Sequence, residues 1–431
     1  MTESLGDKLH HVAEISQKVR SIPSEIQFAT RLRERGFTSA TLTQCNSIGG
    51  LLKLMYQWHL NPDEDFSVNP MTHEHSIPGV IAGIYLGSGK KSAAIFQNSG
   101  LPNVGDGFIS FAENYEIPLL AISTFRGLGE RSYPHQSIAK RTVALARAFV
   151  GQKNVYGSPL GRDIIGNLDK AADVVINKGG EPGQAILLLP KIAIRETMGK
   201  TPPNKADTDY KPLNSEVRYE KGTILEDYME KEELSRDEAL LEIMQRHEDA
   251  LIIFCNGLTA RAALKVKDRR GNFYNAAYMG GGKAIGYGAA ISNPDLSVVV
   301  VDGDENAQMG GSMYDILAEN YPTNLEIYTL NNGGASSVDG AIPSVRLGYW
   351  HYDMTHVIRT RMDDLTGFPH PRVEDGILDL FDPADAEILK QEVGELKFIT
   401  RSVRRWIVQA GKSTLKDNDG NLMIPEAYFK N

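Results

Sequence analysis

The stretch Val298-Val-Val-Val-Asp-Gly-Asp-Glu-Asn-Ala-Gln-Met309 decides how the second half of this chain folds. A run of four valines is typical of a strand that is buried on both faces of a parallel sheet. The run ends at Asp302-Gly-Asp304, and a second apolar run, Leu325–Leu330, ends at Asn331-Asn332 after a helical segment. The carboxyl ends of parallel strands lie at one edge of a sheet, where open α/β sheets bind ligands. We therefore expect Asp304 and Asn332 to lie close together.

This predicted edge carries oxygen ligands for a cation. The carboxylate of Asp304, the side-chain amide of Asn332 and the main-chain carbonyl of Gly334 could bind one ion together. Mg²⁺ prefers such a partial set of oxygen atoms and completes its octahedron with phosphate oxygens and water. Either the Gly-Asp or the Asn-Asn dipeptide alone is more simply explained as a turn. Their spacing across one strand–helix–strand unit favours a magnesium site.

Strand-like and helical segments alternate through both halves of the chain, which predicts parallel sheets covered by helices. Residues 196–234 are rich in proline and charge and are expected to form a polar linker or excursion. We therefore expect an α/β protein with two parallel-sheet αβ domains, residues 1–195 and 235–431. The expected helices are 9–22, 24–35, 77–86, 108–115, 137–150, 235–247, 258–265 and 312–320, and the expected strands are 39–44, 92–97, 118–123, 250–255, 297–301 and 325–330.

Composition and charge exclude several classes of protein. The 431 residues carry a formal net charge of −9 without long runs of one sign, so no nucleic-acid partner is expected. The chain has two cysteines, no apolar signal core at its start and no apolar run near the ~18 residues of a membrane span. These features predict a soluble, cytoplasmic protein with free thiols and no membrane partner. A local site for a small anion is compatible with the net charge.

Several motifs resemble one family of enzymes. The segments Thr72–Lys90 and Phe96-Gln-Asn-Ser-Gly-Leu-Pro-Asn103 are similar to the pyrimidine-binding domain of phosphonopyruvate and sulfopyruvate decarboxylases. The segment Tyr278–Gly288 resembles the Gly-rich loop of their diphosphate-binding domain. The segment from Gly303-Asp304 to Asn331-Asn332 resembles their thiamine-diphosphate and magnesium motif. The resemblance covers most of residues 30–340, and the tail after Gly340 matches poorly.

This resemblance implies a fold, an assembly and an activity. The fold would consist of a pyrimidine-binding domain and a diphosphate-binding domain. The cofactor would lie between domains of two chains, so that Glu74 and Asp304 meet at a subunit interface in a homo-oligomer, either a dimer or a tetramer. The activity would be non-oxidative decarboxylation of a small anionic 2-oxo acid, such as phosphonopyruvate or sulfopyruvate. Two alternatives remain: a carboligase with the same cofactor, and a catalytically impaired homologue acting as a structural or regulatory subunit.

The resemblance also assigns catalytic residues. Glu74 matches the family's glutamate, which hydrogen-bonds the aminopyrimidine ring of thiamine diphosphate and thereby promotes removal of the thiazolium C2 proton. Without the resemblance, Glu74 is more simply explained as a solvated carboxylate at a helix start. His75 and His135 are candidate proton carriers, because histidine titrates near neutral pH. A lone histidine, however, is more often an ordinary surface or core residue.

Further residues are candidates for binding the cofactor and the substrate. Gly280 and Gly281 of the Gly-rich loop and Gly303 of the magnesium motif join Glu74, Asp304 and Asn332 as expected cofactor-binding residues. Asn98, Arg126 and Lys283 are candidates for the substrate, because cationic side chains bind phosphonate or sulfonate groups. For Arg126 and Lys283 the simpler explanation is ordinary surface charge.

The sequence departs from the family's motifs at three places. Glu305 replaces the second glycine of Gly-Asp-Gly, and we expect it to turn away from the diphosphate or to pair with Lys283. The Gly-rich loop carries Gly281 where the family commonly has histidine. The aromatic segment from Tyr349 to His356 is foreign to the family and would either cover a different substrate or form an edge element.

Overall fold

The computed structural model describes residues 22–128, 130, 132–158, 163–177, 182–190, 193–195, 197, 234–333, 355–361 and 383–409. In the last helix, side chains are described from Leu396 onward. Nearly all of the expected helix at 9–22 and of the linker at 196–234 therefore lies outside the described residues. Gly334, the expected third metal ligand, also lies outside them.

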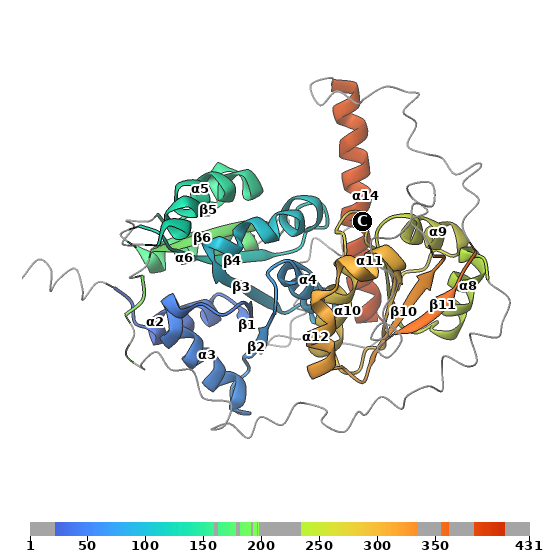
Figure 1. The fold of residues 1–431 in the computed structure, drawn as a ribbon, viewed down its shortest axis with the longest axis horizontal. Coiled ribbons are helices and arrows are strands. Elements are labelled where there is room, and N and C mark those ends of the chain that lie inside the picture. Colours follow the sequence, from blue (N-terminus) through green and yellow to red (C-terminus); the bar gives the residue numbers. More distant parts are fainter. Residues whose placement is uncertain are drawn as a thin grey trace, which may run out of the picture.

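The first domain is a six-stranded parallel sheet with helices on both faces (Figure 1). Its strand order is β2-β1-β3-β4-β6-β5, and every strand pair is parallel. The strands are β1 (Phe37–Leu42), β2 (Ser67–Pro70), β3 (Lys91–Gln97), β4 (Leu119–Phe125), β5 (Val155–Tyr156) and β6 (Gln184–Pro190). The α-helices are α2 (Glu25–Glu34), α3 (Gly49–Leu60), α4 (Ser76–Ser88), α5 (Tyr133–Val150) and α6 (Ile164–Ile176), with a 3-10 helix η2 (Asn98–Val104) and a π-helix η3 (Gly107–Ala112).

The second domain is a five-stranded parallel sheet in the order β11-β10-β9-β7-β8. Its strands are β7 (Leu251–Phe254), β8 (Asn272–Tyr274), β9 (Val298–Gly303), β10 (Leu325–Asn331) and β11 (His356–Arg359). Its helices are α8 (Arg236–Arg246), α9 (Leu258–Val266), α10 (Gly282–Ser292), α11 (Asp304–Met309) and α12 (Ser312–Glu319). The four-valine run is the buried centre of β9, and β10 is its neighbour. The expected fold class, with two parallel αβ sheets, is confirmed.

Helix starts follow the capping signals in the sequence. Ser235 accepts a hydrogen bond from the backbone N–H of Glu238, and the Glu238 side chain accepts one from the backbone N–H of Ser235. This reciprocal capping box satisfies two backbone donors that would otherwise be unpaired, which fixes the start of α8. Ser24 and Gln27 do the same at the start of α2.

The two domains meet where α4 and α10 pack backbone against backbone. Three glycines of α4 face α10 at a spacing of four residues: Gly79, Gly83 and Gly87. Along α4 from its start to its end, these glycines contact residues that lie successively further along α10. The two helices therefore run in the same direction. A Cβ atom on Gly83 would lie 2.0 Å from the carbonyl oxygen of Ile285, and one on Gly288 would lie 2.2 Å from that of Val80. The glycines thus permit an approach that any side chain would block.

The helix α14 (Pro383–Gln409) contacts both domains, although we assigned its residues to the second domain alone. The Arg401 guanidinium pairs with the carboxylate of Glu116 at 2.7 Å, and Thr400 donates a hydrogen bond to the carbonyl of Tyr115. The same helix packs on β8 of the second domain. Figure 1 shows α14 standing beside the junction of the domains. The C-terminal helix therefore holds the two sheets together.

Part of the aromatic segment is an edge strand. His356 begins β11, which pairs with β10 at the end of the second sheet, and its ring stacks on Tyr328 with centroids 4.7 Å apart. This favours the edge-element interpretation for His356, while residues 349–354 lie outside the described part. Within the described residues, no helix is both long and apolar enough to cross a membrane.

The α4–α10 contact predicts a large effect of a small change. Gly83→Ala should lower the free energy of unfolding by roughly 2–4 kcal/mol, because its methyl group overlaps a backbone oxygen that cannot move alone. Gly105→Ala is the matched control, since Gly105 has helical backbone angles and its Cβ would meet only the ring of Phe149 at 3.0 Å. Denaturant unfolding of both variants is the measurement. Equal stability of the two variants would contradict the packing described.

Candidate active site

Glu74 lies in the turn between β2 and α4, and its carboxylate is held by two hydrogen bonds. Thr43 Oγ1 donates to Oε1 at 3.0 Å, and Asn103 Nδ2 donates to Oε2 at 2.9 Å. Gly100 packs directly against the same group, since a Cβ there would lie 2.5 Å from Glu74 Cδ. Residues following β1, preceding α4 and within η2 therefore fix the orientation of one half-buried carboxylate.

The next residue links this turn to the Gly-rich loop of the second domain. His75 Nε2 lies 3.0 Å from the carbonyl oxygen of Met279, and the hydroxyl of Tyr278 donates a hydrogen bond to the carbonyl of His75. Ser76 and Ser312 share a hydrogen bond of 2.8 Å between their hydroxyls. From the resemblance we expected the two halves of the site to meet between chains. In this structure their contacts are made within one chain, and the homo-oligomer stays a prediction that sedimentation would test.

The Gly-rich loop is in turn bound to the helix that starts at Asp304. Gly280 has a positive φ of 68°, and its N–H donates to Asn306 Oδ1 at 2.6 Å. A Cβ on Gly280 would lie 2.6 Å from the backbone nitrogen of Gly310, and one on Gly281 would lie 2.0 Å from the ring of Tyr278. Packing therefore requires both glycines. Their contact with a cofactor stays a prediction.

Asp304 has the properties of a metal ligand. It follows β9 directly, is only 7% exposed, and its Oδ1 accepts from the N–H of Glu305 at 2.9 Å. Its Oδ2 is buried and has no hydrogen-bond partner among the described residues. Burial raises the pKa of this carboxyl group. A cation at Oδ2 would relieve both the desolvation and the missing partner, so the site fits a metal.

Asp304 and Asn332 follow two neighbouring strands at the same edge of the sheet, because Gly303 and Leu330 are paired across β9 and β10. Their joint binding of one ion stays a prediction. The described residues hold no group of three or more His, Cys, Asp or Glu side chains that could bind a metal. A site with one carboxylate, an amide and main-chain or phosphate oxygens is the kind that suits Mg²⁺ rather than a transition metal. The donor set is therefore consistent with the expected ion.

Lys283 pairs with Asp302 and not with Glu305, so one of the two alternatives expected for Glu305 is wrong. That Glu305 turns away from the diphosphate stays a prediction. The side chain of Lys283 is fully buried, with Nζ 2.6 Å from Asp302 Oδ2, 3.1 Å from the carbonyl of Ala307 and 4.9 Å from the centre of the Tyr314 ring. Although burial alone would lower the pKa of Lys283, the carboxylate of Asp302 raises it. The ammonium joins α10 to β9 beneath the site, a geometry that argues against contact with a substrate.

Arg126 and His135 form a cluster around Glu130. The Arg126 guanidinium lies 3.2 Å from Glu130 Oε2, and His135 Nδ1 lies 2.8 Å from the same oxygen. Asn98 is buried, donates to the carbonyl of Arg126 and accepts from its N–H. Asn98 therefore fixes the Arg126 backbone, and a direct contact with substrate is only a prediction. Since η2 runs from Asn98 to Val104, it joins this cluster to Asn103 and Glu74.

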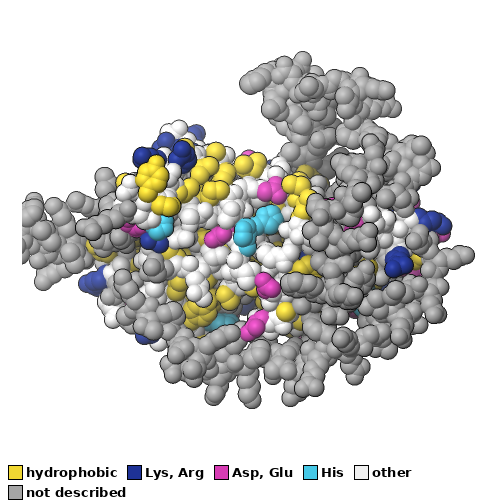
Figure 2. Space-filling model, viewed as in Figure 1, with side chains coloured by type: hydrophobic (Ala, Val, Ile, Leu, Met, Phe, Trp, Pro, Cys, Tyr) yellow, Lys and Arg dark blue, Asp and Glu magenta, His cyan; other side chains and the backbone are white. Residues whose placement is uncertain are grey.

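Two partners of Glu74 were not identified from the sequence. Asn103 is the last residue of the Gln-Asn-Ser-Gly-Leu-Pro-Asn run. Because this run is specific to the family that the sequence resembles, it could have marked Asn103 as a site residue. Thr43 carried no signal, because a threonine at the end of a strand is common. On the face shown in Figure 2, histidine and acidic side chains lie near the middle, where the two domains of Figure 1 adjoin.

The fold is shared with a solved structure. The chain superposes with a TM-score of 0.54 on the X-ray structure of a protein from Mycobacterium smegmatis described as a candidate thiamin diphosphate-dependent enzyme. The match covers 79% of this chain and 100% of that one, at 11% sequence identity. Similarity at this level shows the fold alone.

Sequence comparison identifies particular relatives. The chain is 26% identical over 312 residues to sulfopyruvate decarboxylase from Methanosarcina acetivorans, covering 71% of this chain and 75% of the relative. It is 28% identical over 276 residues to phosphonopyruvate decarboxylase from Streptomyces viridochromogenes, covering 63% of this chain and 65%, just under two thirds, of the relative. Shorter matches are to the separate alpha and beta subunits of sulfopyruvate decarboxylase from Methanococcus maripaludis, 44% identical over 69 residues and 27% over 100. No family profile matches. The resemblance predicted from the motifs is confirmed.

The buried pair under the site predicts non-additive stability changes. Lys283→Met and Asp302→Asn should each lower the free energy of unfolding by roughly 3–5 kcal/mol, because each leaves a buried polar partner uncompensated. The double variant should lose less than the sum of the two. Lys265→Met, which removes a pair with Asp237 that is 71% and 48% exposed, should change stability by less than about 1 kcal/mol. Denaturant unfolding of the parent and the four variants gives a double-mutant cycle with its control. If the losses of unfolding free energy from Lys283→Met and Asp302→Asn simply added in the double variant, the two side chains would not interact directly.

Proposed function

We propose that this chain is a thiamine-diphosphate- and Mg²⁺-dependent decarboxylase of a small anionic 2-oxo acid of the phosphonopyruvate or sulfopyruvate type. One observation carries the proposal: the oriented carboxylate of Glu74 is followed in the chain by His75, which contacts the Gly-rich loop, and that loop is bonded to the helix that begins at Asp304. The named activities of the relatives support the same class of reaction.

The residues divide between two ends of a bound cofactor. Asp304 and Asn332 would hold Mg²⁺ and, through it, the diphosphate. Gly280 and Gly281 would let the backbone approach the cofactor, and Glu74 would face the pyrimidine ring. When bound, the cofactor supplies an electron sink for the pair released as the bond to CO₂ breaks.

Glu74 would hold and return a proton at the pyrimidine nitrogen. Thr43 and Asn103 occupy one lone pair on each carboxylate oxygen and thus keep the group in a single orientation. A carboxyl group fixed in this way transfers a proton without first having to reorient. Gly100 is part of the arrangement, because any larger residue would displace the carboxylate.

Arg126 would bind the anionic tail of the substrate, and His135 would carry a proton. Both side chains are partly exposed, at 22% and 27%, and share the buried carboxylate of Glu130. A guanidinium held at a fixed angle can form two parallel hydrogen bonds with a phosphonate or sulfonate group. Asn98 would act by positioning the Arg126 backbone.

Removal of the proposed metal ligand should abolish cofactor binding. Asp304→Ala should weaken Mg²⁺-dependent binding of thiamine diphosphate by at least about a hundredfold, since even the partners of a metal ligand contribute ten- to a hundredfold. Glu305→Gln, the matched control at the adjacent carboxylate, should bind within about threefold of the parent because charge in a partly exposed side chain is screened. Calorimetry with and without a chelator is the measurement. Equal binding by Asp304→Ala would remove the assignment.

Glu74→Gln should retain the fold and the bound cofactor but lose proton transfer. We expect exchange of the cofactor's C2 hydrogen for deuterium to slow by at least about a hundredfold, because an amide cannot exchange a proton with the ring nitrogen. Glu113→Gln changes an exposed carboxylate of the same domain and should leave the rate unchanged. Exchange followed by NMR tests both variants. A parent-like rate in Glu74→Gln would assign the role to another group.

Release of CO₂ from a panel of 2-oxo acids tests the function itself. Phosphonopyruvate or sulfopyruvate should react without any aldehyde acceptor and with a kcat/KM at least about tenfold above that of pyruvate, since binding of the charged tail adds over about 1.4 kcal/mol. Arg126→Met should remove this preference. CO₂ release that requires an acceptor would favour the carboligase instead. No turnover despite bound cofactor would favour the structural or regulatory subunit.

A further inference from the structure

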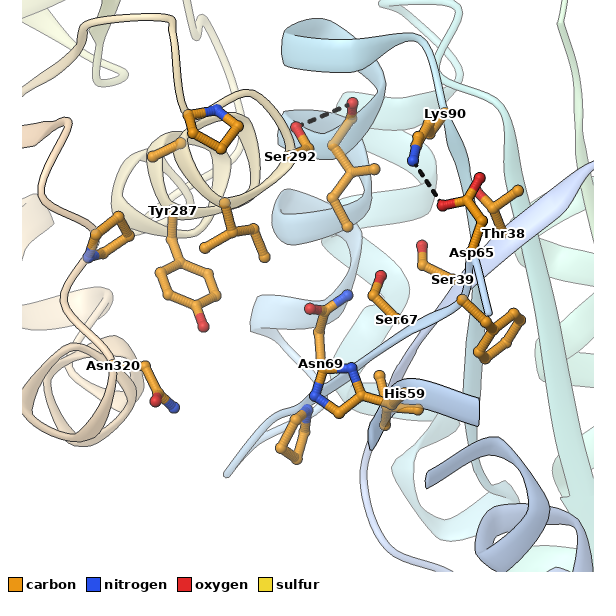
Figure 3. Close-up of a pocket in the computed structure, with 18 of the residues that line it drawn as sticks. Thr38, Ser39, His59, Asp65, Ser67, Asn69, Lys90, Tyr287, Ser292 and Asn320 are labelled. Carbon is orange, nitrogen blue, oxygen red and sulfur yellow. Dashed lines mark hydrogen bonds and ion pairs between the residues drawn. The ribbon is translucent and has the colours of Figure 1, made fainter. Parts of the chain in front are cut away.

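Lys283 carries its charge in a place that solvent does not reach. It lies in the first turn of α10, and its side chain is fully buried. A cavity of about 820 Å³ between the two domains lies along the second half of α10, where Tyr287 and Ser292 line it (Figure 3). Lys283 is not among the described residues that line this cavity. The ammonium group therefore acts through the protein groups that it contacts.

Three contacts surround the ammonium group of Lys283. Nζ donates to Asp302 Oδ2 at 2.6 Å and to the carbonyl oxygen of Ala307 at 3.1 Å, and it lies 4.9 Å from the centre of the Tyr314 ring. These partners belong to β9, α11 and α12, while Lys283 itself belongs to α10. One side chain thus joins four elements of the second domain.

The helix α11 is too short to hold its own position. It has six residues and begins at Asp304, the proposed metal ligand. Helices shorter than about 12–15 residues are marginal in water without packing. Two hydrogen bonds from the segment 280–283 hold α11: the N–H of Gly280 donates to Asn306 Oδ1, and Lys283 donates to the carbonyl of Ala307. The orientation of Asp304 therefore depends in part on Lys283.

The partner Asp302 makes a lysine compatible with a metal site. An unpaired ammonium group near Asp304 would oppose the binding of a divalent cation. Because Asp302 neutralises the ammonium, the pair carries no net charge. Lys283 can therefore fix α11 without placing a repulsive charge beside the metal.

We propose that Lys283 is a positioning residue for the metal site, which holds α11 through the Ala307 carbonyl so that Asp304 presents its carboxylate to Mg²⁺. The inference rests on the proposed function, because it takes Asp304 as the metal ligand. In this role Lys283 contacts neither the metal nor the cofactor. Loss of its ammonium group should loosen α11 and lower the affinity for Mg²⁺ and thiamine diphosphate in a chain that still folds.

Two variants separate the contact with Ala307 from the charge of the pair. Lys283→Met removes the contact and leaves Asp302 buried without its partner. Lys283→Met combined with Asp302→Asn also lacks the contact but contains no buried charge, so it should unfold at a higher denaturant concentration than Lys283→Met alone.

Calorimetry measures Mg²⁺-dependent binding of thiamine diphosphate by the parent and both variants. Each variant should bind at least about tenfold more weakly than the parent, since partners of a metal ligand contribute ten- to a hundredfold. Parent-like binding by Lys283→Met would make Lys283 purely structural. Parent-like binding by the double variant would show that the contact with Ala307 is not needed. Either result would overturn the proposal.

Leu168→Ala is the control for lost stability alone. Leu168 is fully buried in the core of the first domain, and its truncation leaves a cavity that destabilises the fold. Its affinity for the cofactor should stay within about threefold of the parent, because distant sites without shared partners act independently. If Leu168→Ala lost as much affinity as Lys283→Met, stability alone would set the binding, and the proposal would be overturned.

Hydrogen exchange of the cofactor-free chain gives a readout that does not depend on the proposed function. Peptides covering residues 304–310 should exchange at least about tenfold faster in both Lys283 variants than in the parent, since exchange reports local opening. In Leu168→Ala they should exchange at nearly the parent rate. Parent-like exchange in the Lys283 variants would overturn the proposal. If the parent binds neither Mg²⁺ nor the cofactor, the proposed function fails, and the exchange rates decide whether Lys283 holds α11.

Discussion

The backbone contact between α4 and α10 is the constraint on which the rest of the structure depends. It places the start of α4, with Glu74, and the start of α10, with the Gly-rich loop, at the same end of two parallel helices. Leu86 and Ala290 extend one continuous apolar core through the junction of the domains. A core shared in this way makes the relative position of the two sheets a consequence of close packing, which tolerates little change in volume.

In the second domain, the charges around two carboxylates at the end of β9 distinguish their roles. Asp302 and Asp304 stand two residues apart at the end of β9 but have different surroundings. Asp302 Oδ2 has the buried ammonium of Lys283 as its partner, whereas Asp304 has no cationic partner this close in the described part of the chain and accepts from the N–H of Glu305. The second oxygen of each carboxylate has no hydrogen-bond partner among the described residues. The difference follows from position: Asp302 is the last strand residue to point toward α10, and Asp304 begins the next helix. Asp302 therefore has a structural role in the buried ion pair, while the role of Asp304 as a metal ligand is the one proposed above.

The sequence predicted the fold well where local pattern and burial agree. The valine run, the capping residues of α8 and most of the long apolar strands were correctly placed, because the spacing of apolar residues reports which side chains are buried. The strands β2, β5, β6 and β8 and the helices α3 and α6 were not identified. The element η3 was expected as an ordinary α-helix, since nothing in Gly107–Ala112 marks a π-helix. The partners of Glu74 and Lys283 depend on packing between segments distant in sequence. No local pattern encodes them.

The helix α14 has a consequence for how the chain acquires its structure during synthesis. Arg404 donates to the carbonyl of Leu86, and Arg401 pairs with Glu116, across sequence separations of 318 and 285 residues. The first sheet can form as soon as it leaves the ribosome, because its strands lie within residues 37–190. Its surface around Leu86 and Tyr115 is first covered by the second domain, and its contacts with α14 form only after residues 400–404 have been translated. The nascent chain therefore cannot complete the junction of its two domains until its C-terminal helix has been made.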